Sequence, residues 1–149
     1  MKKTLLILAA IVFAVTACEK QTYVDGTYTA TFDEPHYGWT DFLTVTLEND
    51  AVTEVDFDGV NDAGDLKSTD SAYNANMWAN SDPQNKPELF TPAIEAALSN
   101  ATIIPEYEEI DAVTGATGAS ENANLLMEAI LDIATEGDVS EVVISYPAE

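Results

Sequence analysis

The chain has 149 residues, a length that suits a single domain. Hydrophobic residues make up 46% of it, which is enough to bury a core and excludes a disordered acidic tail. Against 27 acidic residues stand five lysines and no arginine, so the formal charge is -22. This charge excludes nucleic-acid binding through phosphate contacts. It also opposes docking on anionic lipid, so membrane attachment requires an acyl chain or an apolar segment.

Residues 1–17 are typical of a bacterial export signal. Lys2 and Lys3 form a basic start, and the apolar run at residues 5–15 is too short to span a bilayer. Small residues follow this run, as they do before a cleavage site. The sequence therefore predicts a protein that is exported across the cytoplasmic membrane.

Cys18, the only cysteine, directly follows this segment. Residues 15–18, Val-Thr-Ala-Cys, resemble a lipobox, at which a signal peptidase cuts before a cysteine that carries a diacylglyceryl group. We expect Cys18 to be the lipidated N-terminus, residues 18–24 to form a linker and residues 25–149 to form the domain. The mature chain then has a net charge of -24, with the three lysines Lys20, Lys67 and Lys86. The alternative is a plain signal peptide with an incidental cysteine.

Three segments in the first half of the domain alternate apolar and polar side chains with the period of a β-strand. The first follows Asp25-Gly26, the second covers residues 42–48, and Asn49-Asp50 supplies the turn to the third. These segments predict an antiparallel meander. Its apolar face consists of Tyr28, Ala30 and Phe32, then Leu43, Val45 and Leu47, then Val55 and Phe57.

Three later segments have apolar residues at helical spacing. Residues 71–80 form the first and residues 87–100 the second, which begins with a proline. The third has Ser120 as its N-cap and ends near Gly137. Residues 141–146 predict a last strand. The predicted fold class is α+β, in which an antiparallel sheet, made of the meander and the C-terminal strand, packs with about three helices.

Residues 111–120 join the second and third of these helices with the sequence Asp-Ala-Val-Thr-Gly-Ala-Thr-Gly-Ala-Ser. A glycine-containing loop that enters a helix presents backbone N–H groups and the positive end of the helix dipole, which suit an anion such as phosphate. The segment is not a P-loop, because the lysine is absent and the spacing differs. Spacing alone leaves open a well-turned loop without any ligand.

The segment from Asp111 to Thr117 is similar to the Asp-x-x-(Ser/Thr)-Gly-Ala-Thr signature of FMN-binding domains. This resemblance implies that a separate flavin transferase of the ApbE type, with FAD and Mg²⁺, joins the phosphate of FMN to the Thr117 hydroxyl. Asp111, Thr114, Gly115 and Ala116 then form the loop that the transferase reads. The resemblance extends to residues 25–28, 38–46, 67–68 and 72–74, whereas the C-terminal strand is not part of the pattern.

Over most of its mature length, the chain resembles flavinylated lipoproteins that carry electrons outside the cytoplasmic membrane. The resemblance implies a membrane-anchored electron carrier with redox partners in the cell envelope, and not a catalyst with its own substrate. The alternative is a lipid-anchored protein that binds a small ligand or another envelope protein without flavin. The candidate neighbours of a flavin ring are the aromatic residues Tyr37, Trp39, Tyr73, Trp78 and Phe90.

No metal site is expected from the sequence. His36 is the single histidine, and neither a second histidine nor a nearby cysteine gives ligand spacing, so we expect it in a solvated loop. The run of Asp56, Asp58, Asp62 and Asp65 does not match the EF-hand pattern and predicts a solvated acidic loop.

We predict that Cys18 carries acyl chains that tether the domain to a membrane, outside the cytoplasm. Metabolic labelling with a fatty-acid analogue should label the wild-type protein. Cys18→Ala should abolish both the label and the partition into membranes. A variant that still takes up label would place the anchor elsewhere in the chain.

Overall fold

The computed structural model describes residues 22–147. Cys18 and the predicted signal peptide lie outside this range. The described elements match the predicted three strands, three helices and last strand. In chain order they are β1 (Gly26–Phe32), β2 (Thr40–Glu48), β3 (Ala51–Val60), a short 3₁₀ turn η1 (Lys67–Thr69), α1 (Ser71–Asn80), α2 (Pro87–Ser99), α3 (Thr117–Ala134) and β4 (Val142–Ile144).

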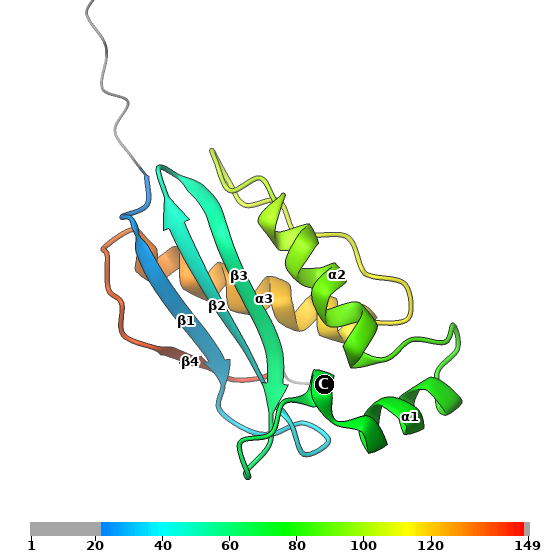
Figure 1. Cartoon of the computed structure of the whole chain (residues 1–149). Coiled ribbons are helices and arrows are strands. Elements are labelled where there is room, and N and C mark those ends of the chain that lie inside the picture. The colour runs from blue at the N-terminus through cyan, green and yellow to red at the C-terminus, as the bar shows by residue number, and fades with distance from the viewer. Residues whose placement is uncertain (1–21, 148–149) are drawn as a thin grey trace, which may run out of the picture.

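The four strands lie in the order β3-β2-β1-β4 (Figure 1). The pairs β1–β2 and β2–β3 are antiparallel, which confirms the predicted meander and the α+β class. The sheet as a whole is mixed, however, because β4 is parallel to β1, with Ile144 opposite Phe32. The direction of α3 explains this difference. The helix returns the chain to the end of the sheet where β1 begins, and there the Val24 N–H donates to the Ala134 carbonyl at 2.8 Å.

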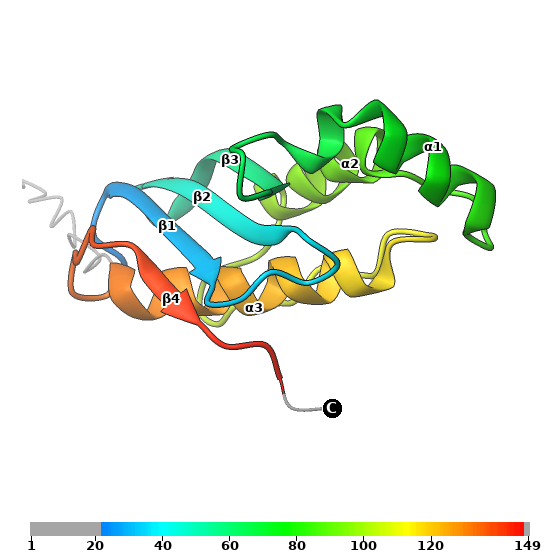
Figure 2. The same cartoon turned by 90° about the horizontal axis from the view of Figure 1, so that it is seen from below.

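One face of the sheet is covered by α2 and α3, while α1 extends away from the sheet beyond the end of β3 (Figures 1 and 2). The apolar faces of the strands and of the two helices form a single core. Burial of one such large apolar side chain stabilises a fold by about 1.5–3 kcal/mol. Among the most deeply buried residues are Tyr28, Leu43, Val45, Leu47, Phe57, Ile94, Leu98, Leu126, Met127 and Ile130.

The chain just before β1 is held by the turn between β2 and β3. Asn49 and Asp50 adopt positive φ angles of 53° and 57°, as a two-residue hairpin turn requires. The Asp50 carboxylate accepts hydrogen bonds from the backbone N–H groups of Thr22 and Tyr23, and Tyr23 is buried in the core. Thr22 and Tyr23, which fall in the predicted linker, are therefore held by the domain.

The third helix begins earlier than the sequence predicts. Its first residue is Thr117, and Ser120 lies within the first turn, so the prediction that Ser120 is the N-cap is wrong. The Ser120 hydroxyl is buried, donates to the Ala116 carbonyl and accepts from the Val113 N–H, both at 3.0 Å. Ser120 thus ties the preceding loop to the helix. Within residues 22–147, no helix is both long enough and apolar enough to cross a bilayer.

Candidate functional site

A cavity of about 380 Å³ lies at the end of the sheet where β1 ends and β2 begins. Its wall comes from parts of the chain that are far apart in sequence: the hairpin after β1, the turn η1, the three helices and the residues after β4. The lining residues are His36, Tyr37, Asp41, Lys67, Tyr73, Met77, Phe90, residues 115–119, Glu121, Asn122 and Tyr146.

Thr117 is an exposed residue on this wall and the first residue of α3. No side chain caps the helix at this end, and the N-cap residue is Ala116. The first N–H groups of a helix have no partner within it, and the helix dipole places partial positive charge there. The Thr117 hydroxyl therefore lies beside backbone donors at the electropositive end of the helix.

The loop before Thr117 is held tightly against the segment between α1 and α2. Asn85 Nδ2 donates to the Thr114 carbonyl at 2.6 Å, and the Ala116 N–H donates to the Val113 carbonyl at 2.8 Å. Gly115 has a φ of +74°, and a Cβ at this position would lie 2.8 Å from the Pro83 carbonyl oxygen. Both the positive φ and the close contact require glycine here.

The predicted loop residues divide into two groups. Gly115, Ala116 and Thr117 line the cavity, whereas Asp111 and Thr114 do not. Thr114 is exposed and is held through its carbonyl. The Asp111 carboxylate is exposed and makes no hydrogen bond within the described part of the chain. It lies at a separate shallow hollow beside the end of α2.

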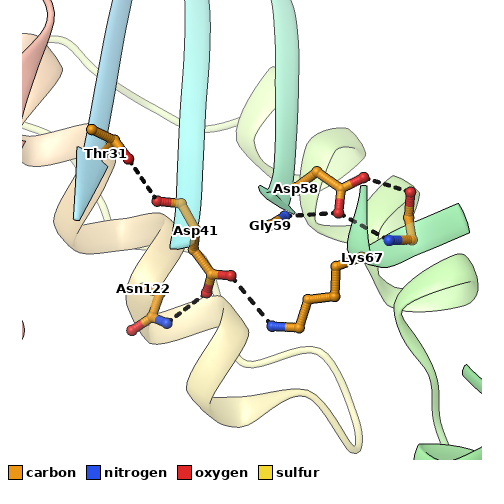
Figure 3. Close-up of polar contacts among 7 residues, drawn as sticks. Thr31, Asp41, Asp58, Gly59, Lys67 and Asn122 are labelled. Atoms are coloured by element: carbon orange, nitrogen blue, oxygen red, sulfur yellow. Dashed lines mark hydrogen bonds and ion pairs between the residues drawn. The ribbon is translucent and has the colours of Figure 1, made fainter. Parts of the chain in front are cut away.

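A nearly buried ion pair forms part of the cavity wall (Figure 3). Lys67 Nζ lies 3.3 Å from Asp41 Oδ1, and the two side chains are 15% and 6% exposed. The second carboxylate oxygen of Asp41 accepts from Asn122 Nδ2 at 2.8 Å, and its backbone carbonyl accepts from the Thr31 hydroxyl. Each oxygen of the carboxylate thus has a partner, as a charge removed from water requires.

The backbone next to Lys67 is held by Asp58, which contradicts the prediction that Asp58 belongs to a solvated loop. Asp58 is 5% exposed and accepts from the Gly59 N–H, the Ser68 N–H and the Ser68 hydroxyl (Figure 3). Asn74 on α1 also donates to the Lys67 and Ser68 carbonyls. The lysine therefore projects into the cavity from a rigid backbone.

Three of the five candidate aromatic residues, Tyr37, Tyr73 and Phe90, line the cavity. Trp39 is buried behind the wall and packs edge-on against Tyr73, with ring centroids 5.5 Å apart. Trp78 lies in a different hollow, between α1 and the start of α2.

Tyr146, Met77 and Asn122 are wall residues that the sequence did not single out. Met77 falls in a predicted helical stripe, but nothing in the local pattern marks it as a cavity residue. Tyr146 follows β4, outside the matching motifs, and its ring stacks on Phe32 with centroids 3.8 Å apart. Its hydroxyl is buried and lacks a well-formed hydrogen bond within the described residues, although it lies beside the Asp41 N–H. Burial, with a smaller contribution from the Asp41 charge, raises the pKa of Tyr146 to about 12.

Across residues 22–147, no three histidine, cysteine, aspartate or glutamate side chains are grouped so that they are able to hold a metal ion. His36 is exposed in the β1–β2 hairpin, as predicted, and contacts Tyr37 and Tyr146 through its ring. Asp65 pairs with Asn61 in its own loop.

We predict that Gly115→Ala lowers the free energy of unfolding by about 1–3 kcal/mol, because the new Cβ meets backbone atoms at a positive φ. Gly118→Ala is the matched control in the same loop-to-helix segment. A Cβ there has no neighbour within 4 Å, so the variant should be roughly 0.5–1 kcal/mol more stable. Urea unfolding of both variants measures the two effects. Equal stabilities would contradict the assigned loop conformation.

The chain is similar to a known lipoprotein in sequence and to a solved crystal structure in fold. The chain is 35% identical over 130 residues to the 15 kDa lipoprotein of Treponema pallidum, and the match covers 87% of this chain and 88% of that protein. The crystal structure of the CPE2226 protein from Clostridium perfringens matches with a TM-score of 0.73 and 27% identity, over 84% of this chain and 99% of that chain.

A scan against family profiles finds none that matches the chain, so the resemblance to FMN-binding domains depends on the motif residues themselves. The related sequence, in contrast, is similar over nearly the full length of both proteins. Such identity over one continuous domain establishes common descent. The chain therefore belongs to the family of the 15 kDa lipoprotein of Treponema pallidum.

Proposed function

We propose that this protein is a membrane-anchored flavoprotein electron carrier whose FMN is attached through its phosphate to Thr117. The observation that carries the proposal is the position of Thr117. The last residue of the matching motif is an exposed threonine on the wall of a cavity that is also lined by aromatic rings and a lysine.

The residues of the cavity fit FMN in both size and chemistry. Sites for small ligands measure about 300–1,000 Å³ and combine apolar walls with a few polar groups. The uncapped N-terminus of α3 suits the phosphate. Tyr37, Tyr73, Met77 and Phe90 supply apolar surface for a flat ring, and Lys67 and Asn122 supply donors.

The charge of the chain supports a covalent attachment. FMN brings a phosphate dianion, whereas the mature protein has a net charge of -24 and three lysines. Among the described lysines, Lys86 is paired with Glu88 and Lys67 with Asp41. Little positive charge is left to hold a dianion by attraction alone. A phosphoester at Thr117 removes one negative charge and prevents loss of the cofactor outside the cell.

The electron chemistry belongs to FMN, which accepts and donates one or two electrons when bound. The chain supplies the attachment atom, the fixed loop and the surroundings of the ring. Because Lys67 is paired with Asp41, the pair adds no net charge to the wall. The acidic character of the whole chain then determines the electrostatic potential in the cavity.

The geometry of the fold suits a lipid-anchored carrier. Thr22 is bonded to Asp50 in the β2–β3 turn, at the end of the sheet where β1 begins. The cavity lies at the opposite end, where β1 ends and β2 begins. These two ends of the strands are at opposite sides of the sheet in Figure 1. The helix α3 connects the two ends, and its 18 residues span about 27 Å. With acyl chains on Cys18, as expected in a lipoprotein family, the cavity lies at the end of the domain opposite Thr22, the first described residue. Both the flavin transferase and redox partners of the cell envelope then have access to it.

We predict that Thr117→Ala abolishes flavinylation, because it removes the attachment oxygen. Thr114→Ala is the matched control, since Thr114 belongs to the same loop but contributes its carbonyl to the contact with Asn85. Co-expression with a flavin transferase should add the mass of one FMN residue to the wild type and none to Thr117→Ala, and any flavin on Thr114→Ala should map to Thr117. Flavin mapped to any other residue would refute the assignment.

We also predict that the flavinylated domain has a lower reduction potential than free FMN, because reduction adds negative charge in an acidic field. Charges at the surface are screened over about 10 Å at 0.1 M ionic strength, so added salt should raise the potential. Redox titration at low and high salt measures both effects.

Two lysine variants test this electrostatic explanation. Lys67→Gln leaves the Asp41 carboxylate on the wall without its cation, so the potential should fall further. Lys86→Gln removes a lysine that pairs with Glu88 outside the cavity and should change the potential less. A potential above that of free FMN, or one that falls with salt, would mean that local donors dominate.

A further inference from the structure

The hairpin between β1 and β2 contains a strained residue at the mouth of the cavity. His36 and Trp39 exchange backbone hydrogen bonds of 2.8 and 3.1 Å, which closes a two-residue turn over Tyr37 and Gly38. Both turn residues have positive φ angles, 53° and 84°. Glycine adopts this conformation without cost, but a bulky aromatic residue does so rarely.

A second turn in the same chain shows which residues this geometry favours. The β2–β3 turn also has positive φ at two consecutive residues, and it uses Asn49 and Asp50. Short polar side chains of this kind tolerate the left-handed conformation because they bond locally to the backbone. A tyrosine at the equivalent place in the first turn therefore makes the apo fold less stable than an asparagine would.

Burial does not compensate for this strain, because Tyr37 is 81% exposed. It nevertheless has a defined position at the cavity. Its ring lies 4.3 Å from that of His36, His36 lies 5.4 Å from Tyr146, and Tyr146 stacks on the buried Phe32. A column of four rings thus runs from the core to the cavity mouth and ends at Tyr37.

We propose that Tyr37 covers the flavin ring at the mouth of the cavity and shields it from solvent. This inference rests on the proposed function and assigns one residue of the cofactor site. Residues with strained backbone conformations occur mainly at functional sites, because the strain lowers the stability of the fold. A flat ring bound in the cavity gives the mostly exposed Tyr37 ring a second aromatic partner besides His36.

The test compares Tyr37→Asn with Tyr37→Phe in the apo and the flavinylated domain. Asparagine tolerates the positive φ and has no ring. The flavin-free Tyr37→Asn variant should therefore unfold at a higher urea concentration than the flavin-free wild type. In the flavinylated domain, loss of the cover should raise the bimolecular rate constant for acrylamide quenching of flavin fluorescence about twofold or more, while phenylalanine should keep it near wild type. This rate constant is the Stern–Volmer constant divided by the fluorescence lifetime of each variant without acrylamide, so it reports access to the ring and not a change in lifetime. Trp78→Ala, which removes an exposed aromatic residue outside the cavity, is the control and should leave the quenching constant unchanged.

The outcomes separate this inference from the proposed function. If FMN is attached and acrylamide quenching in Tyr37→Asn equals that of wild type, Tyr37 does not cover the ring and the inference alone fails. A lower urea midpoint for unfolding of the flavin-free Tyr37→Asn variant would show that the tyrosine ring stabilises the fold. That result also refutes the inference. If mass spectrometry finds no FMN on the wild type after co-expression, the proposed function fails and this inference fails with it.

Discussion

The packing of α3 across one face of the sheet is the interaction on which the rest of this structure depends. The buried stripe of the helix, which includes Leu126, Met127 and Ile130, meets the buried faces of β1 and β2. This contact sets the direction of the helix relative to the sheet. One end of α3 then carries Thr117 to the cavity, and the other end meets the start of β1 through Val24. The parallel pairing of β4 and the approach of Tyr146 to the cavity follow from the same direction, because the chain leaves α3 at the start of β1.

The residues around the cavity include several energetically unfavourable arrangements that are not found in the apolar core described above. A carboxylate and an ammonium group are nearly buried together, and they are tolerated because Asn122 and rigid neighbouring backbone complete their contacts. Tyr37 holds a conformation that the fold alone disfavours. The Tyr146 hydroxyl lies buried without a well-formed hydrogen bond in the described chain. Such local departures lower stability, and their concentration at one end of the sheet distinguishes this end from the core.

Local patterns in the sequence predict most of the secondary structure. The alternation of Tyr28, Ala30 and Phe32 predicts the buried face of β1, and Asn49-Asp50 predicts the hairpin turn. The limits of α1 and α2 also follow from spacing and flanking residues. The start of α3 was wrong by one turn, because Ser120 has the chemistry of a helix cap but uses its hydroxyl to hold the loop before the helix. A serine near a helix end is able either to cap the helix or to bond the preceding loop. Here the Val113 N–H lies within hydrogen-bond distance of the Ser120 hydroxyl, so the serine bonds the loop.

The sequence by itself determined the strand and helix pattern, the acidic character of the chain and the motif that ends at Thr117, because each is a property of neighbouring residues. It also marked Tyr37, Tyr73 and Phe90 as candidates, but it did not separate them from Trp39 and Trp78, since exposure depends on what packs beside a side chain. Only the tertiary structure decided that the C-terminal strand is parallel, that Asp41 and Lys67 form a pair, and that Tyr146 lies beside them. These contacts join residues that are far apart in the chain, and no local period encodes which distant segments meet at the end of a sheet.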